Sequence, residues 1–388
     1  MKIAYISQTA LSDVDFSYMK EAQKLMDITY YIQVSPSTKH KAAVSFKSLP
    51  EKFAIIPASK VPELDVFGNI VDLNKVFVIN ETATRNYQLK NIFESYKIYK
   101  ELRRKKFDVI HLTWPPSILD LFPYLLKHKT VLTVHDPFSH SSVHNYVREM
   151  ERKLSFRFFN HFIVLNKAQI DNFIKCYQLD KPSKYVYCSL LGRYDYLNIY
   201  KDHIQETNYQ QILFFGNISS YKGIDVLLEA MLLVHQQNPF VKLIIAGGGS
   251  YWFDITPYKK LDYIDIKNRY IPDVELVELI SSSAYVVVPY KDATQSGVIM
   301  TAYAFNKPCI ASNVGALPEV VKDGINGLIV PPNDKEALAQ SIVFLLSHPE
   351  KIETFSINIS STYEKGLYSW ERIASQYLDI YNSVISLD

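Results

Sequence analysis

The sequence contains few cysteines and no long apolar run. Its 388 residues include three cysteines, with no C-x-x-C pair, which favours a reducing compartment over a disulfide framework or a cysteine zinc site. No stretch approaches the roughly 18 apolar residues of a membrane helix. The first residues, MKIAYISQ, lack the apolar core and cleavage site of a signal peptide, so we expect a first strand there.

Charge is distributed unevenly along the chain. Residues 1–200 hold 28 Lys and Arg against 19 Asp and Glu, a balance of +9, whereas residues 201–388 hold 14 against 21, a balance of −7. This asymmetry suggests two domains with different partners. The basic half either exposes solvated helix ends or is attracted to an anionic membrane surface or acceptor, where clustered cations contribute roughly 1 kcal/mol each.

Short β-rich runs alternate with helical stretches in both halves. In the first half the runs lie at 2–7, 108–113, 130–135, 161–166 and 185–190. In the second half they lie at 211–216, 241–247, 284–290, 308–312 and 327–332, with helices expected at about 223–236, 273–282, 297–305 and 334–347. This alternation predicts the α/β class, with two Rossmann-like, doubly wound domains facing a cleft. Ligands of such sheets bind outside the carboxyl ends of the strands.

The polar stretch at 197–210, LNIYKDHIQETNYQ, predicts the domain boundary. We expect a first domain over residues 1–203 and a second over 204–367. The last stretch, YSWERIASQYLDIYNSVISL, has apolar residues at helical spacing and predicts an amphipathic helix within 368–388.

A lone lysine stands at the mouth of a predicted helix. In LFFGNISSYKGIDVLLEA (213–230), an apolar strand ends at Gly216, and Lys222 and Gly223 precede the helix. A strand end followed by a helix N-terminus forms an anion site, because unbonded N–H groups and the helix dipole point at the ligand. The pattern GxxxxGK[ST] is absent. Lys222 therefore either neutralises a diphosphate or is an ordinary surface lysine.

Two further loops follow strands of the same predicted sheet. In PYKDATQSGVIMTAYA (289–304), Ser296, Gly297 and Val298 open a helix just after a strand. The stretch IAGGGS (245–250) is a glycine-rich turn after another strand. Loops that follow parallel strands meet at one edge of the sheet, so all three are expected to contact the same ligand.

These stretches, with KPCIASNVGALPEVVKDGINGLIVPPND (307–334), resemble glycosyltransferase family 4, the retaining, sugar-nucleotide-dependent enzymes of GT-B fold. The resemblance covers most of residues 211–346. The first half resembles the family more weakly, through DVIHLTWPP, TVHDPFSH and LLGRYDYL. The closing YSWERIA resembles the terminal helix that crosses back to the first domain in this fold.

The resemblance implies a UDP- or GDP-sugar donor, bound mainly by the second domain. Lys222 would neutralise the leaving diphosphate, and the backbone amides of Ser296, Gly297 and Val298 would hold phosphate oxygens. His135 would face the donor sugar as the second catalytic residue. The remaining donor-binding residues would be Gly216, Asn217, Gly223, Gly248 and Thr301. No metal, no cofactor and no nucleic acid are expected.

Four polar residues near the expected cleft are candidates for the acceptor side: Asp13, Asp15, Tyr18 and Asn145. The chain also departs from the family pattern. Asn217 and Ser219 stand where relatives carry an arginine, and Ala293 and Thr301 stand where most carry two glutamates.

The resemblance implies transfer of a hexose to a hydroxyl of a glycan or lipid-linked acceptor, in bacterial surface polysaccharide assembly. The expected location is the cytoplasm, with peripheral contact at the inner face of the cell membrane. Two other functions remain open. One is a catalytically silent sugar-nucleotide-binding subunit that scaffolds a partner, and the other is a GT-B sugar-nucleotide epimerase.

Overall fold

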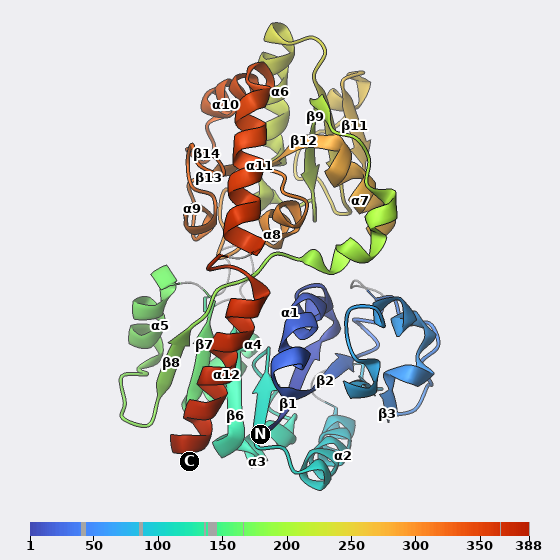
Figure 1. Ribbon diagram of the computed structural model, residues 1–388, viewed down its shortest axis with the longest axis vertical. Helices are drawn as coiled ribbons and strands as arrows, with labels where there is room; N and C mark the ends of the chain where they lie inside the picture. The colour runs from blue at the N-terminus through green and yellow to red at the C-terminus, as the bar shows by residue number, and fades with distance from the viewer. Residues whose placement is uncertain are drawn as a thin grey trace. The chain divides into compact units, whose positions relative to one another are not determined.

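The computed structural model describes residues 1–39, 44–84, 88–135, 137–138, 146–165, 167–364 and 366–387. The chain forms two units (Figure 1). Unit 1 comprises the described residues up to Gly192 together with those from Trp370 onward, and unit 2 comprises Arg193–Ser369.

Unit 1 is built on an eight-stranded sheet of order β3-β4-β2-β1-β5-β6-β7-β8. All neighbours pair in parallel except β3 and β4. The strands are β1 (Lys2–Gln8), β2 (Asp27–Val34), β3 (Ala54–Pro57), β4 (Val76–Asn80), β5 (Val109–Leu112), β6 (Thr130–Val134), β7 (His161–Val164) and β8 (Tyr185–Cys188). Its α-helices are α1 (Ser12–Leu25), α2 (Leu89–Lys105), α3 (Leu121–Leu125), α4 (Tyr146–Phe158), α5 (Ile170–Tyr177) and α12 (Trp370–Leu387).

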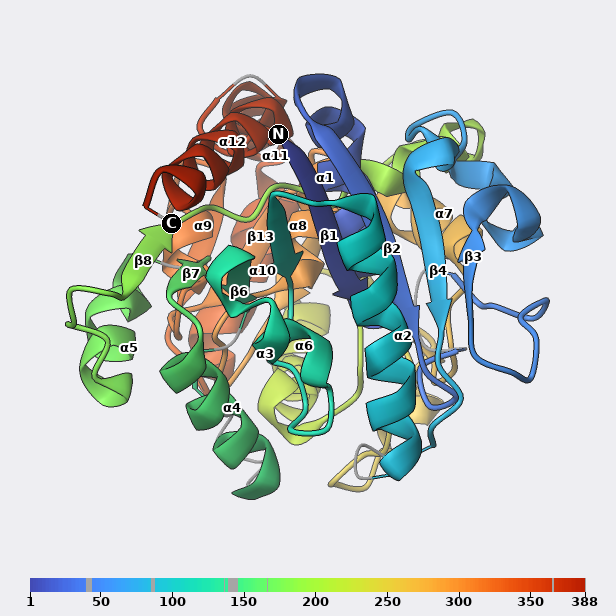
Figure 2. The ribbon, with the colours of Figure 1, turned by 90° about the horizontal axis from the view of Figure 1, so that it is seen from below.

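The two faces of this sheet are covered by different helices, because successive side chains of a strand point to opposite faces. On one face, Ile6 and Ile110 belong to a buried apolar cluster that includes residues of α2, α3, α4 and α5. Figure 2 shows α2, α3 and α4 on the near side of these strands. The alternate residues Tyr5 and His111 have ring centroids 4.8 Å apart, and His111 stacks on Tyr377 of α12.

A buried polar network joins α12 to the sheet. The His111 imidazole bonds the Tyr381 hydroxyl through Nδ1 at 2.5 Å and the Thr133 hydroxyl through Nε2 at 2.7 Å. Burial lowers the pKa of His111 to about 3, so this imidazole is neutral. The helix expected within 368–388 therefore packs as part of unit 1. His111 acts as a support for α12.

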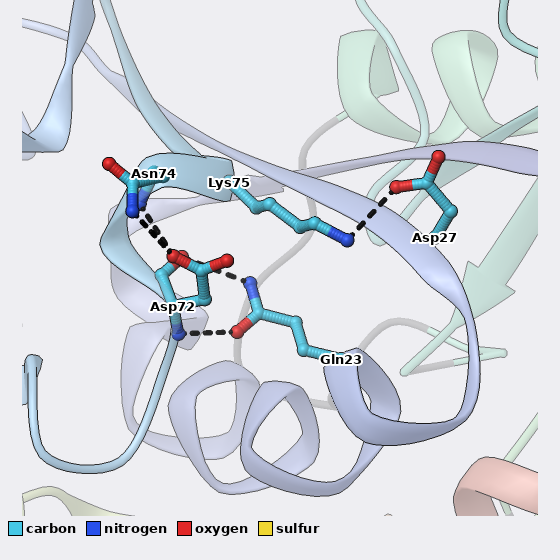
Figure 3. Close-up of polar contacts among 5 residues, drawn as sticks. All are labelled: Gln23, Asp27, Asp72, Asn74 and Lys75. Atoms are coloured by element: carbon cyan, nitrogen blue, oxygen red, sulfur yellow. Dashed lines mark hydrogen bonds and ion pairs between the residues drawn. The ribbon is translucent and has the colours of Figure 1, made fainter.

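Polar contacts also connect the segment just before β4 with the end of α1 and the start of β2 (Figure 3). The Gln23 carboxamide accepts from the backbone N–H of Asp72 at 2.7 Å, and the Asp72 carboxylate accepts from the N–H of Asn74 at 3.0 Å. Lys75 pairs with Asp27 at 3.0 Å. Exposed contacts of this kind contribute little stability each, but together they set where these two parallel neighbours enter the sheet.

Unit 2 contains a six-stranded, wholly parallel sheet of order β11-β10-β9-β12-β13-β14. Its strands are β9 (Asn208–Phe215), β10 (Lys242–Ala246), β11 (Ile264–Lys267), β12 (Ser283–Val288), β13 (Cys309–Ser312) and β14 (Gly327–Val330). Its α-helices are α6 (Ile224–Gln237), α7 (Asp273–Ser282), α8 (Gly297–Ala304), α9 (Leu317–Val320), α10 (Lys335–Ser347) and α11 (Pro349–Glu364). Near-continuous buried runs in β9 and β12 reflect a sheet covered on both faces.

The structure confirms two α/β domains with parallel sheets. Every strand expected from the sequence is present, whereas β2, β3, β4 and β11 were not anticipated. The division between the units falls after Gly192, earlier than the expected boundary at 203/204. The reason is that the intervening 3-10 helix, η7 (Asp195–His203), packs on α7 and α8 and so belongs to unit 2.

Candidate functional site

The carboxyl edge of the unit 2 sheet carries the residues that the sequence selects for a donor site. After β9 the chain passes Gly216 and forms a short 3-10 helix, η8 (Ser220–Lys222), before α6 begins. After β12 it forms a loop that ends at the N-terminus of α8. Because β9 and β12 are parallel neighbours, these two loops lie beside each other.

Gly223 allows the two loops to touch. Its φ of +68° lies in the left-handed region, and a Cβ there would overlap the carbonyl oxygen of Pro289. Next to it, the N–H of Lys291 donates to the carbonyl oxygen of Tyr221 at 2.7 Å. These backbone contacts hold Lys222 against the loop that follows β12.

Lys222 packs on aromatic rings and not on a counter-charge. Its Nζ lies 3.7 Å from the centroid of the Tyr290 ring and 4.9 Å from that of Tyr221. No carboxylate of the described residues forms an ion pair with it. Burial lowers the pKa of Lys222 to about 7, because a desolvated ammonium group is disfavoured. An anionic ligand would supply the missing partner.

Lys291, a second lysine at this edge, already has a carboxylate partner. Its Nζ lies 2.6 Å from a carboxylate oxygen of Asp225 in the first turn of α6. Lys222 is therefore the better placed of the two to meet an incoming diphosphate.

The N-terminus of α8 adjoins Lys222 through the Tyr290 ring. The Tyr290 hydroxyl lies 3.5 Å from Oγ of Ser296, and Ser296 caps the helix by accepting from the N–H of Ile299 at 3.4 Å. Within the described part of the chain, the amides of Gly297 and Val298 are bonded to no acceptor. They are the unpaired donors that a helix N-terminus offers to an anion.

Three further residues that the sequence predicts as donor contacts are Gly216, Gly248 and Asn217. Gly216 and Val298 approach each other, since a Cβ at Gly216 would lie 3.3 Å from Cγ2 of Val298. A Cβ at Gly248 would make ordinary van der Waals contact with the backbone of Arg269 and Tyr270, at 3.5–3.8 Å. Asn217 is exposed one residue after Gly216. These residues follow β9 and β10 at the same carboxyl edge of the sheet as Lys222 and the start of α8.

Thr301, which the sequence predicts as a donor contact, is buried in α8. The sequence places it among the donor contacts, but its side chain is 7% exposed and its hydroxyl donates to the carbonyl oxygen of Gly297 at 2.9 Å. A threonine in a helix satisfies its own hydroxyl in this way. The hydroxyl proton of Thr301 is therefore used within α8 and is not available for donation to a ligand.

Two of the predicted acceptor-side residues also require correction. Asp15 is fully buried and accepts from the hydroxyls of Tyr5 at 2.7 Å and Tyr30 at 3.1 Å. Tyr18 is 2% exposed, with its hydroxyl 3.5 Å from that of Tyr381. Both face the interior of unit 1, because they lie on the side of α1 that packs against the sheet and α12.

The other candidate site residues of unit 1 are Asp13, His135 and Asn145. Asp13 is half-buried at the start of α1, where burial raises its pKa to about 6. His135 is half-buried directly after β6. Asn145 lies outside the described residues. Among the described residues, no group of three or more His, Cys, Asp and Glu is placed to hold a metal ion.

Two aromatic residues of the site were not predicted. Tyr290 supplies the ring beneath Lys222, and its position at the end of an apolar strand was the available signal. The Tyr194 ring lies over Gly297, where a Cβ would come within 3.0 Å of a ring carbon. Tyr194 precedes η7, 103 positions before Gly297 in the chain, so only the fold brings it to α8.

Comparisons with known families agree with this arrangement. Residues 209–348 match the family model described as Glycosyl transferases group 1, and residues 60–189 match the model described as Glycosyltransferase Family 4. The chain thus contains one region that matches each of these two glycosyltransferase models. The first match lies in unit 2 and the second in unit 1.

Relatives at the sequence level match part of this chain. One is the D-inositol 3-phosphate glycosyltransferase of Saccharomonospora viridis, 28% identical over 187 residues, or 45% of this chain and 43% of that protein. Another is an uncharacterized glycosyltransferase of Methanocaldococcus jannaschii, 29% identical over 182 residues, or 46% of each chain. The chain thus matches less than half of the length of these relatives.

Solved structures extend the likeness over the whole chain. Sucrose-phosphate synthase from Thermosynechococcus elongatus has a TM-score of 0.70 and 18% identity, and the match covers 100% of both chains. Anabaena HepE in complex with UDP has a TM-score of 0.68 and 16% identity, and the match covers 99% of this chain and 100% of that one. At these identities the likeness concerns the fold, which is that of the GT-B glycosyltransferases.

Proposed function

We propose that this protein transfers a hexose from a nucleotide diphosphate sugar to a hydroxyl acceptor, with retention at the anomeric carbon. One observation carries the proposal: Lys222 is held over Tyr290 without a counter-charge, next to the unpaired amides at the start of α8. A diphosphate supplies the negative charge that both groups lack.

In the proposed reaction the bond between the anomeric carbon and the diphosphate oxygen breaks, and a bond to the acceptor oxygen forms on the same face of the sugar. The acceptor proton passes to the departing diphosphate. Lys222 and the amides of Gly297 and Val298 stabilise the charge that develops on the leaving group, without a divalent metal. His135 is proposed to contact the donor sugar and to orient it.

UDP is the nucleotide we propose first, with GDP as the second candidate. HepE, a structural neighbour, was solved in complexes with UDP and with UDP-glucose. The proposed acceptor is a glycan or a lipid-linked glycan of a bacterial surface polysaccharide, handled by a protein that binds the inner face of the membrane from the cytoplasm. In the described residues, none of the helices is long and apolar enough to cross a bilayer.

The test combines binding and turnover. A thermal-shift series with UDP, GDP, ADP and dTDP identifies the nucleotide, because a ligand at 100 times its Kd stabilises the folded state by about 2.7 kcal/mol. Sugar nucleotides of that base are then incubated with the protein, and release of the nucleoside diphosphate is measured. Release supports a transferase, and the anomeric configuration of a product, read by NMR, tests retention.

A silent sugar-nucleotide-binding subunit is the second candidate. It is favoured by the absence of an arginine at Asn217 and Ser219 and by the internal bond of Thr301, which leave Lys222 as the unpaired cation of the donor site within the described chain. Nucleotide binding without release from any sugar nucleotide would favour this reading over the transferase.

A further inference from the structure

Unit 1 contains a cavity of about 380 Å³ that the donor chemistry does not use. Residues at the carboxyl ends of β1, β2 and β4 line it, among them Gln8, Gln33 and Glu81, together with the loop that follows β5. Parallel α/β sheets bind ligands at this edge. A cavity of this volume accommodates a small polar molecule such as a monosaccharide.

Three carboxyl groups lie in the wall of this cavity: Glu81, Asp120 and Glu151. Glu151 is only 7% exposed, and its one hydrogen bond in the described structure is a long one, 3.4 Å, from the N–H of Ile118 to Oε1. Its other oxygen has no partner among the described residues. Glu81 accepts from the Gln33 carboxamide at 2.6 Å through one oxygen.

No cation of the described residues compensates these acids. Neither lysine nor arginine lines the cavity in the described structure, and none of the three carboxylates forms an ion pair with a described residue. They also do not form a group placed to hold a metal ion. Buried charges are normally paired, because an unpaired one loses its hydration without compensation. Within the described part of the chain, these acids therefore have no positive partner.

The pKa values of two of these carboxyl groups agree with this geometry. Burial and the nearby Asp120 raise the pKa of Glu81 to about 8, and burial raises that of Asp120 to about 7. An ammonium group among these carboxyls would stabilise their charged forms. A phosphate would meet carboxylates and no cation of the described lining, so the same wall disfavours it.

The rest of the lining suits a polyol. The carboxamides of Gln8 and Gln33 offer both donors and acceptors to hydroxyl groups. Trp114 adds an apolar ring on which the carbon face of a sugar can lie. Small ligands are oriented by a few such polar groups within an otherwise enclosing wall.

We propose that this cavity binds an amine-bearing polyol, such as an amino sugar or an aminocyclitol, with its ammonium group between Glu81, Asp120 and Glu151. Under the proposed transferase function, on which this step rests, that molecule is the acceptor or its terminal residue. A phosphorylated acceptor is disfavoured by the same three carboxyls.

Binding of glucosamine, glucose, N-acetylglucosamine and glucose 6-phosphate to the full-length protein tests this. Calorimetry or ligand-observed NMR should show glucosamine binding at least about tenfold more tightly than the other three, since an ammonium–carboxylate contact is a strong, charge-assisted one. Glu151→Gln and Glu81→Gln should remove that preference. Glu51→Gln, at an exposed glutamate of the same unit, should leave it unchanged. A melting curve checks that each variant is folded.

Several results would overturn the inference: no measurable binding of glucosamine, equal affinity for glucosamine and glucose, tightest binding of glucose 6-phosphate, or an unchanged preference in both glutamine variants. Release of nucleoside diphosphate from the donor is measured in parallel on the wild type. If that release occurs but glucosamine is not preferred, the cavity inference fails and the transferase stands. If glucosamine is preferred but no donor is consumed, the proposed function fails and the amine site stands.

Discussion

The ammonium nitrogen of Lys222 lies 3.7 Å from the centre of the Tyr290 ring, and the hydroxyl of that ring lies 3.5 Å from Oγ of Ser296 at the start of α8. One tyrosine thus joins the lysine of one loop to the helix N-terminus of the next. A cation over an aromatic face gains about 0.5–2 kcal/mol, which holds the lysine in place while leaving its charge available to a ligand.

Lys222→Met should weaken donor binding and slow transfer without weakening the fold. The lost charge-assisted contact is worth about 1.5–3 kcal/mol in binding, and more when charge builds on the leaving group, so kcat/KM should fall by about 100-fold or more. Methionine keeps the apolar stem over Tyr290, and no buried ion pair is broken. Donor titration, initial rates and a melting curve measure this. Lys242→Met, at the exposed start of β10 on the opposite sheet edge, is the control. Wild-type rates in Lys222→Met would contradict the site.

Donor affinity should decrease as the pH rises above 7. Burial lowers the pKa of Lys222 to about 7 in the free protein, while a bound diphosphate favours its charged form. Below pH 7 the lysine is already protonated. Above it, each pH unit should cost up to about tenfold in affinity until the pKa of the complex is reached. Lys222→Arg, which stays charged, should flatten the curve. A flat profile in the wild type between pH 6.5 and 8.5 would contradict this.

Gly223→Ala should lower the melting temperature and the donor affinity together. Alanine at a φ of +68° is strained by about 1–2 kcal/mol, and its Cβ would also overlap the carbonyl oxygen of Pro289. Gly324 is a matched control, since its φ is also +68° but nothing lies within 4 Å of its Cβ position. Gly324→Ala should therefore cost the backbone strain alone. Equal melting temperatures for the two variants would show that the loop contact is unimportant.

His135→Ala should slow transfer while leaving nucleotide affinity nearly intact, because its proposed contact is to the sugar and not to the diphosphate. The measurement is the affinity for the free nucleoside diphosphate beside the turnover of the sugar nucleotide. A tenfold or larger fall in kcat at unchanged affinity is about 1.4 kcal/mol of lost transition-state stabilisation. Normal turnover in a folded variant would remove the catalytic role.

The exposed face of α2 should bind anionic vesicles in a salt-sensitive way. Leu89, Phe93 and Tyr96 recur at helical spacing and are 74%, 70% and 51% exposed, beside the exposed Lys97 and Lys100. Reversing both lysines to glutamate should reduce vesicle binding, since each cation near such a surface contributes about 1 kcal/mol and salt screens it.

The control for this charge reversal is Lys259→Glu with Lys260→Glu, two exposed lysines of unit 2. Sedimentation with neutral and anionic vesicles at two salt concentrations measures the effect. Binding that is equal on both vesicle types, or absent from both, would contradict membrane association through α2.

Local pattern predicted the fold class and the position of the two loops that we propose to bind the donor. Continuous apolar runs separated by helical stretches predict buried parallel strands, and the loops that hold Lys222 and Ser296 follow such strands directly in the sequence. Both loops were therefore placed at one sheet edge without any knowledge of distant contacts. The terminal helix was predicted for the same reason, since its apolar residues repeat with helical period.

Tertiary structure decided which side chains are free to act. From the sequence, Asp15 is a polar residue expected at the cleft. In the structure it is buried, and its carboxylate accepts hydrogen bonds from the hydroxyls of Tyr5 and Tyr30. Thr301 stands at a donor position, yet its hydroxyl bonds its own helix. Likewise, the three acids of the unit 1 cavity come from segments up to 70 residues apart in the chain. Burial and long-range contact depend on how strands and helices pack, and no local pattern in the sequence encodes them.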